Sequence, residues 1–145
     1  MNISATTDID FITQCILANY DWLTDDGDTD PDMYFPPMGE NITWVQVGEF
    51  GVFLLERRSH IMFECHTALL PAARGKAVDI GKQALKWAFE NTPALRIITA
   101  VPETNPLALR MALKSGFIQY GINTGSFCKR GKLYSQFLLG INKGD

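Results

Sequence analysis

The stretch Ile61-Met-Phe-Glu-Cys-His-Thr-Ala-Leu-Leu70 is followed directly by Pro71-Ala-Ala-Arg-Gly-Lys-Ala77, and this succession decides the fold. The first run is mostly apolar and predicts a buried strand, whereas the second reads as a short basic loop. Apolar residues then recur with helical spacing over about Val78–Asn91, and the following Thr-Pro pair ends the helix. The sequence therefore predicts a strand, a basic loop and a helix in direct succession.

The basic loop places Arg74, Gly75 and Lys76 just before the start of the helix. Backbone N–H groups without an intrahelical acceptor and the positive end of the helix dipole converge at such a point. This arrangement favours an anion, and we interpret the loop as a phosphate-binding turn. The alternative is a solvated basic turn on the surface.

Strands are also predicted on both sides of this unit. Ile42–Val47 and Val52–Glu56 precede Ile61–Leu70 and are separated from it and from each other by short turns, which indicates an antiparallel meander. Arg96–Val101 reads as a strand after the helix. Two strands joined by a crossover helix pair in parallel, so the sheet is expected to be mixed.

The remaining elements lie at the two ends of the chain. Residues 8–19 read as a capped amphipathic helix, and residues 105–116 as a helix with an Asn cap, Pro at its first position and Gly at its end. A strand begins over 117–120, and the last strand covers 133–139. A basic segment at 128–132 is typical of a hairpin turn, either solvated or in contact with an acidic partner or a ribose phosphate.

Length and composition indicate one α/β domain over residues 1–145. The net charge of −3 does not favour binding of the protein as a whole to nucleic acid or to an anionic membrane. Cys15, Cys65 and Cys128 are widely spaced and are expected to be reduced thiols rather than zinc ligands or disulfides. With neither a signal peptide nor a long apolar span, we expect a cytoplasmic protein.

Residues 24–32 form an acidic segment rich in turn-forming residues. Alternating aspartates invite comparison with an EF-hand loop, but Pro31 and Pro37 occupy positions where that motif needs glycine and glutamate. We therefore predict no metal site and a solvated loop. Its charge hints at a cationic or amine substrate.

Two motifs resemble those of the GCN5-related N-acetyltransferase (GNAT) superfamily. Leu69-Leu-Pro-Ala-Ala-Arg-Gly-Lys-Ala77 is similar to its coenzyme A loop, V-x-P-x-x-R-G-K-G. Asn105-Pro-Leu-Ala-Leu-Arg-Met-Ala-Leu-Lys-Ser-Gly-Phe117 is similar to its N-x-x-A-x-x-L-Y-x-K-x-G-F signature. The resemblance covers about Gly39 to Leu139. It implies an acyl-CoA N-acyltransferase fold with a central mixed, mostly antiparallel sheet, a V-shaped opening between two parallel strands, and helices on both faces.

The resemblance also implies how acetyl-CoA would bind. The pantetheine arm would lie in the opening against the backbone of the first parallel strand, and the pyrophosphate would lie on the loop amides. Asn105 would touch the cofactor and Phe117 would shape the site. The residues implied for the strand and the loop are Ala68, Leu69, Leu70, Arg74, Gly75, Lys76, Ala77, Val78 and Asp79.

The sequence departs from the family pattern at three positions. Ala77 and Asp79 stand where the loop motif has small residues, usually glycine. A carboxylate near a pyrophosphate is unfavourable unless Asp79 points away, as a residue of the first helical turn can. Ala112 replaces the tyrosine that returns a proton to the departing thiolate in many members.

Candidate catalytic residues follow from strand spacing and from the missing tyrosine. Glu64 and His66 share one face of their strand, and His66 is our first candidate for the general base, before Glu64. Tyr134 and Tyr120 are the candidate acids in place of the missing tyrosine.

Two functions are consistent with these features. The first is an acetyl-CoA-dependent N-acetyltransferase acting on the primary amine of a small molecule or peptide. The second is a catalytically weak or inactive protein of the same fold with a binding or assembly role. A looser similarity to small bacteriophage-encoded acetyltransferase-like proteins suggests a phage structural protein as a partner, head morphogenesis as the process and the host cytoplasm as the location. A homodimer is compatible with either function. A nucleotide-binding βαβ protein is disfavoured, since neither a Walker motif nor GxGxxG is present.

Overall fold

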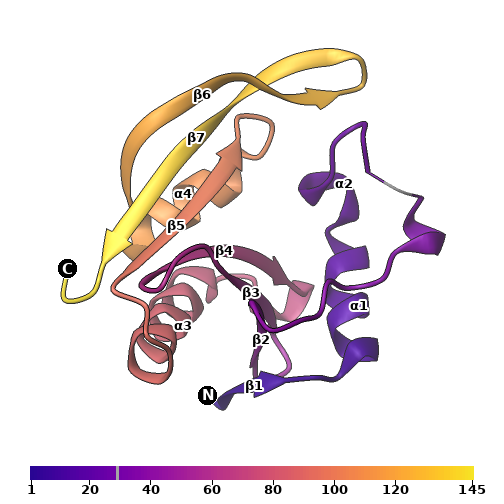
Figure 1. The fold of residues 1–145 in the computed structure, drawn as a ribbon. Coiled ribbons are helices and arrows are strands. Elements are labelled where there is room, and N and C mark those ends of the chain that lie inside the picture. The colour runs from indigo at the N-terminus through magenta and orange to yellow at the C-terminus, as the bar shows by residue number, and fades with distance from the viewer. Residues whose placement is uncertain (29) are drawn as a thin grey trace.

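A seven-stranded mixed sheet with helices on both faces forms the body of the protein in the computed structural model, which describes residues 1–28 and 30–145 (Figure 1). The strand order is β1-β2-β3-β4-β5-β7-β6, and among the described strands only β4 and β5 pair in parallel. In chain order the elements are β1 (Ile3–Thr6), α1 (Ile9–Ala18), α2 (Tyr20–Leu23), η1 (Pro31–Met33), β2 (Ile42–Val47), β3 (Gly51–Arg57), β4 (Met62–Leu69), η2 (Pro71–Ala73), α3 (Ala77–Asn91), β5 (Arg96–Pro102), α4 (Pro106–Ser115), β6 (Ile118–Lys129) and β7 (Lys132–Asn142).

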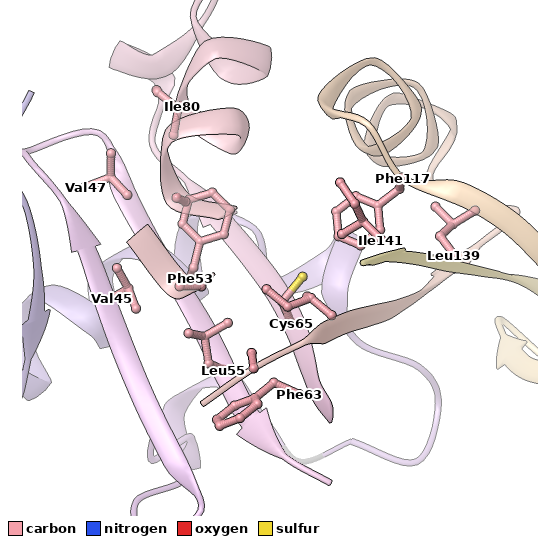
Figure 2. Packing of buried hydrophobic residues seen from close by; sticks show 14 of the residues in the cluster. Val45, Val47, Phe53, Leu55, Phe63, Cys65, Ile80, Phe117, Leu139 and Ile141 are labelled. Atoms are coloured by element: carbon pink, nitrogen blue, oxygen red, sulfur yellow. The ribbon is translucent and has the colours of Figure 1, made fainter. Parts of the chain in front are cut away.

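Alternation along the central strands divides the core into two layers. One face carries the side chains packed against α3 and α4, including Val45, Phe53 and Cys65 (Figure 2). The opposite face carries Trp44, Val52 and Ala68, which pack against Ile12 and Cys15 of α1. Successive strand residues point to opposite faces, so β2, β3 and β4 supply both layers. The predicted mixed sheet with helices on both faces is confirmed.

The helix ends follow from local capping. Asp8 accepts a hydrogen bond from the Phe11 N–H at the start of α1, and Asn105 accepts one from the Ala108 N–H at the start of α4. Gly116 ends α4 in the left-handed conformation, with φ of 114°. These are the caps that the sequence predicts.

The C-terminal hairpin is much longer than expected. β6 runs to Lys129 and β7 covers Lys132–Asn142, whereas the sequence predicted the start of a strand over 117–120, with no end assigned, and a last strand over 133–139. β6 is an edge strand rich in polar residues and glycine, and its register shifts between Gln119 and Gly121 and again between Asn123 and Phe127. Bulges of this kind break the period-two pattern by which strands are predicted. The short elements β1 and α2 were also not predicted.

Candidate functional site

The parallel strands β4 and β5 pair only at their N-terminal ends. Their register runs from Met62 opposite Arg96 to Glu64 opposite Ile98, and beyond this point β5 pairs with β7 alone. Thr99 Oγ1 donates a hydrogen bond of 2.8 Å to the Cys65 carbonyl where the strands separate. The predicted V-shaped opening therefore begins at Cys65 and Thr99.

Backbone groups of β4 are directed alternately to β3 and to the opening. The Leu70 N–H donates to the Phe50 carbonyl at 2.7 Å on the β3 side, and Ala68 lies opposite Val52 in the same ladder. The pattern of an antiparallel pair then directs Thr67 and Leu69 toward the opening. Of the three strand residues implied by the resemblance, Leu69 faces the opening through its backbone, whereas Ala68 and Leu70 face β3. Thr67 was not predicted, although the same alternation could have identified it.

A cavity of about 180 Å³, here called the sheet cavity, passes through this opening. On the α3 and α4 side its wall includes Ala84, Ala108 and Ala112. On the α2 side the wall includes Trp22 and Leu23. Small residues on the helices leave this space open, so the two faces of the sheet communicate between β4 and β5.

A second cavity of about 620 Å³, here called the outer cavity, lies on the α1 and α2 side of the sheet. Its wall includes Tyr34, Trp44 and Leu54. Both cavities are lined by Leu23, His66 and Thr67, so the two spaces meet at the middle of β4. A group at this junction can be reached from either cavity.

His66 and Glu64 are brought together as their spacing predicts. His66 Nε2 lies 2.7 Å from Glu64 Oε2, and Arg58 Nη2 lies 3.2 Å from the same oxygen. The hydrogen bond from His66, followed by the contact with Arg58, lowers the pKa of Glu64 to about 2. An ionised carboxylate only accepts hydrogen bonds, so Nε2 carries a hydrogen and Nδ1 of the neutral ring remains an acceptor. Glu64 is thus a weak base that orients His66, and Arg58, which the sequence did not single out, holds Glu64.

The basic loop is a turn of 3-10 helix followed by the start of α3. Gly75 has φ of 79°, and a Cβ built on it meets nothing within 4 Å. Lys76 is the N-cap but makes no side-chain cap, so the amides of Ala77, Val78 and Asp79 point outward without an intrahelical acceptor. These amides and the positive end of the helix dipole make the surface of the loop receptive to an anion.

The charged side chains of this loop point to different neighbours. Lys76 Nζ lies 4.8 Å from the centre of the Phe50 ring, and Arg74 is exposed. The Asp79 carboxylate accepts a hydrogen bond of 2.8 Å from Gln83 Nε2, one turn along the exposed face of α3. Asp79 therefore points along the helix rather than across its end.

The predicted cofactor residue Asn105 is both a helix cap and part of the sheet cavity. Its Oδ1 accepts a 3.3 Å hydrogen bond from the Ala108 N–H, and the residue lines the cavity beside Ala112. Tyr120 and Tyr134 line neither cavity; Arg96 lies over the first ring and Lys132 over the second, each at 5.3 Å. The structure does not bring these tyrosines to His66.

Two hydroxyl groups in the sheet cavity donate hydrogen bonds to the backbone. The Ser115 hydroxyl donates to the Met111 carbonyl at 2.7 Å, as Thr99 does to Cys65. Burial raises the pKa of the Cys65 thiol to about 12, so this thiol is not a nucleophile. Within residues 1–28 and 30–145, no three His, Cys, Asp or Glu side chains gather closely enough to hold a metal ion.

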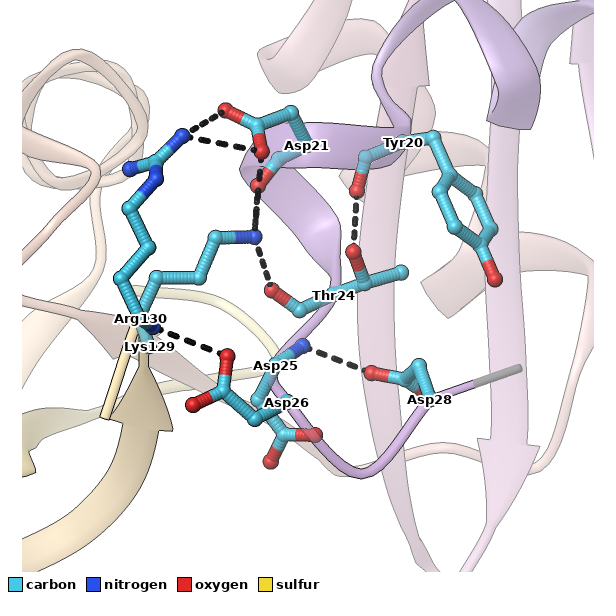
Figure 3. Close-up of polar contacts among 8 residues, drawn as sticks. All are labelled: Tyr20, Asp21, Thr24, Asp25, Asp26, Asp28, Lys129 and Arg130. Carbon is cyan, nitrogen blue, oxygen red and sulfur yellow. Dashed lines mark hydrogen bonds and ion pairs between the residues drawn. The ribbon is translucent and has the colours of Figure 1, made fainter. Parts of the chain in front are cut away.

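The acidic segment and the basic hairpin turn bind each other (Figure 3). Asp26 accepts hydrogen bonds of 2.8 Å from the N–H groups of Arg130 and Gly131. Lys129 Nζ donates to the carbonyls of Asp21 and Thr24 at 2.6 and 2.7 Å. The prediction of a solvated acidic loop did not include this contact, because the two segments lie about a hundred residues apart in the sequence. For the basic turn, an acidic partner was one of the alternatives left open, and the structure shows one within the same chain. Residue 29 of the acidic segment lies outside the described residues.

The contact between the acidic segment and the hairpin turn lowers the pKa of both Asp21 and Asp26. The Gly131 and Arg130 amides lower the pKa of Asp26, and Lys129 lowers the pKa of Asp21. The Arg130 guanidinium also lies 3.3 Å from the Asp21 carboxylate. The hairpin turn is thus anchored to the segment that borders the outer cavity.

Solved structures of similar fold are acetyltransferases. A point mutant of spermidine N-acetyltransferase SpeG from Vibrio cholerae is 17% identical over 98% of this chain and 95% of its own, with a TM-score of 0.77. Spermidine N-acetyltransferase from Vibrio cholerae in complex with CoA and spermine is 15% identical over 98% and 95%, with a TM-score of 0.70. A GNAT-family acetyltransferase from Bacillus anthracis is 18% identical over 72% and 68%, with a TM-score of 0.60. The fold is therefore GNAT-like.

No curated protein sequence matches the chain. Among the described residues, no helix combines the length and the apolar character needed to cross a bilayer. Residues 24–111 match a family model described as protein of unknown function, DUF2824. This match spans β2 to β5, the basic loop and most of α4, and the chain belongs to the DUF2824 family.

Proposed function

We propose that this protein transfers the acetyl group of acetyl-CoA to a primary amine. The observation that carries the proposal is the meeting of the sheet cavity and the outer cavity at His66 and Thr67. A cofactor arm on one side of the sheet and an amine on the other could react at this junction. The names of the similar enzymes, one of them in complex with CoA and spermine, support the same reaction.

Several groups fit coenzyme A at the opening. The backbone of Thr67 and Leu69 faces the gap between β4 and β5, where a pantetheine amide would pair with it as an added strand does. The Leu69 carbonyl already accepts a 2.9 Å hydrogen bond from Asn19 Nδ2, so the Leu69 N–H and the Thr67 groups are the ones that this bond leaves for the cofactor. The amides of Gly75, Ala77, Val78 and Asp79 and the side chains of Arg74 and Lys76 would hold the pyrophosphate, whereas the Lys76 amide already donates to the Ala73 carbonyl. Asn105 lies at the wall of the sheet cavity, where it would contact the cofactor.

The reaction needs an uncharged amine and a route for two protons. His66 Nδ1 takes one proton from the substrate ammonium, directly or through a water, while Glu64 holds Nε2–H. The amine nitrogen forms a bond to the thioester carbonyl carbon, the C–S bond breaks, and coenzyme A leaves as a thiolate. The second amine proton passes from nitrogen to water, His66 releases its proton to solvent, and the thiolate takes one proton from solvent. Since a free thiol has a pKa of about 8.5, this last step does not require the tyrosine that Ala112 replaces.

Calorimetric titration with acetyl-CoA, combined with a thiol-release assay against a panel of amines, tests the proposal. We expect acetyl-CoA to bind, coenzyme A thiol to appear only when amine is present, and His66→Gln to lower kcat by roughly a hundredfold with little effect on acetyl-CoA binding. If millimolar acetyl-CoA gives no binding heat and no thermal shift, the proposal is refuted.

A second function, binding or assembly without turnover, is favoured by one observation. Trp22, Met33 and Phe35 are 52%, 77% and 67% exposed, and large apolar side chains at a surface often mark a partner site. The looser resemblance to phage proteins suggests a head-assembly protein as that partner. Stable co-purification with such a protein, together with no thiol release on any amine, would favour this function over the first.

A further inference from the structure

The outer cavity is walled mainly by apolar and aromatic side chains. Trp44 is 3% exposed, and its indole N–H donates to the Pro37 carbonyl at 2.9 Å, so its ring is fixed. The rings of Tyr20 and Tyr34 meet edge to face with centroids 6.0 Å apart. Ile16 and Leu54 contribute aliphatic surface to the same wall. Rigid rings and aliphatic groups around a space of about 620 Å³ suit a compact apolar body.

Negative charge is scarce in this cavity. Among the described residues that line it, Asp28 is the only carboxylate, and its Oδ2 already accepts a 2.7 Å hydrogen bond from the Asp25 N–H. The adjacent Asp21 and Asp26 are occupied by Lys129, Arg130 and Gly131 of the hairpin turn (Figure 3). Among the described lining residues, the wall of the outer cavity therefore offers one carboxylate, that of Asp28, to a ligand with several positive charges. Asp25, Asp30 and Asp32 of the acidic segment do not line it.

His66 fixes the end of the cavity where an amine would react. It lines both cavities, and its Nδ1 is the acceptor left by the bond to Glu64. An amine placed there would have the rest of its molecule between Tyr34, Trp44 and Leu54.

We infer that the acceptor is a small monoamine with an aryl or branched-alkyl body, rather than a polyamine. This inference rests on the proposed acetyltransferase function and names its substrate class. A polyamine would bring further ammonium groups against a mainly apolar wall, where Asp28 is the one described carboxylate that could pair with them, whereas an aryl or branched-alkyl body would bury apolar surface there. Aromatic faces also attract cations, so a direct comparison of the two amine classes is needed.

The experiment compares 2-phenylethylamine with spermidine on the full chain. Calorimetry measures the binding of each amine without requiring turnover, and thiol release with acetyl-CoA measures kcat/KM. We expect 2-phenylethylamine to bind and react better than spermidine by at least roughly tenfold. Equal or better binding of spermidine would overturn the inference, as would a lack of binding by both amines. Failure of the acetyltransferase function would be seen separately, as absent acetyl-CoA binding or absent thiol release.

A charge placed at the mouth of the cavity gives a sharper test. Phe35 lines the outer cavity and is 67% exposed, so Phe35→Asp adds a carboxylate without opening the core. Ile118→Asp is the matched control, since Ile118 is 65% exposed on the edge strand β6 and lines neither cavity. We expect Phe35→Asp to shift the preference toward spermidine by roughly tenfold and Ile118→Asp to leave it unchanged. An identical response of both variants would contradict the assignment of this cavity to the acceptor.

Discussion

The two basic turns of this protein, Arg74–Lys76 and Lys129–Gly131, have similar composition and opposite surroundings. Each contains two cationic side chains and a glycine with positive φ, 79° at Gly75 and 74° at Gly131. The second turn is neutralised by Asp21 and Asp26, whereas the first is followed by the uncapped N-terminus of α3. A basic, glycine-containing turn can bind an external anion only where the fold does not already supply a carboxylate. The difference is set by tertiary contacts and not by the residues of the turn.

The largest effect on acetyl-CoA affinity is expected when the two cationic side chains of one turn are removed. One double variant is made for each turn. Arg74→Ala combined with Lys76→Ala should weaken acetyl-CoA binding by about 3 kcal/mol, roughly a hundredfold, because charged hydrogen bonds to phosphate are lost. Lys129→Ala combined with Arg130→Ala should leave this affinity unchanged. Calorimetric titration of both double variants measures the contrast, and equal losses would show that both turns contact the cofactor.

Substitution of Gly75 or Gly131 by alanine separates the cost of backbone strain from the effect on acetyl-CoA binding. A Cβ at Gly75 or at Gly131 meets nothing within 4 Å, so each substitution should cost about 1 kcal/mol of folding free energy through its positive φ alone. Only Gly75→Ala should also weaken acetyl-CoA binding, by roughly tenfold, since its methyl group lies where a phosphate would approach the amides. Urea denaturation and calorimetry on the same samples distinguish the two effects. A tenfold loss in Gly131→Ala would contradict the assignment.

The carboxylate that holds the second turn can be removed without touching its cations. In Asp26→Asn an NH2 group replaces one of the two oxygens that accept from the Arg130 and Gly131 N–H groups. One of these N–H groups then faces another donor, so we expect a lower Tm and unchanged acetyl-CoA affinity. Because the fold lowers the pKa of Asp26, its contribution is present above the unfolded pKa of about 3.9 and is lost as the pH falls through the folded value. Melting curves between pH 7 and pH 3 should therefore converge for the native and Asp26→Asn proteins at the acidic end.

The segment from β4 through the first basic turn to α3 was the most predictable part of the chain, because its strand spacing and helix ends are set by residues that are close in sequence. The predicted helix 78–91 differs from α3 by one residue, because a Thr-Pro pair ends it and a basic loop precedes it. Glu64 and His66 were paired correctly by period-two spacing within one strand. Arg58 was missed because it reaches Glu64 from the turn between β3 and β4, where no periodicity applies.

The contacts of the second turn could not be predicted from the sequence. Its position as a hairpin turn was predicted correctly, but its partner was not, since Asp26 lies 104 residues from Arg130. The outer cavity likewise depends on contacts between distant segments, since its wall is drawn from α1, α2, β2, β3 and β4. No periodic pattern or motif encodes these contacts. The junction at Thr67, by contrast, follows from the register of β3 and β4 and could have been predicted from the strand alternation.

The smallest effect on acetyl-CoA affinity is expected when Asp79 is substituted. Asp79 lies at the start of α3, the helix that follows the first basic turn. If it faced the pyrophosphate at ~6 Å under an effective dielectric near 20, repulsion would reach about 3 kcal/mol. Its bond to Gln83 on the exposed face of α3 places it in water instead, where the same separation gives about 0.7 kcal/mol. Asp79→Asn should therefore tighten acetyl-CoA binding by only about threefold. The carboxylate also favours the first turn of α3 through the helix dipole, so the variant should be slightly less stable. A gain in affinity of a hundredfold would mean that Asp79 turns toward the phosphates on binding. The first turn would then also have a nearby carboxylate, and the two turns would differ only in how strongly their charge is neutralised.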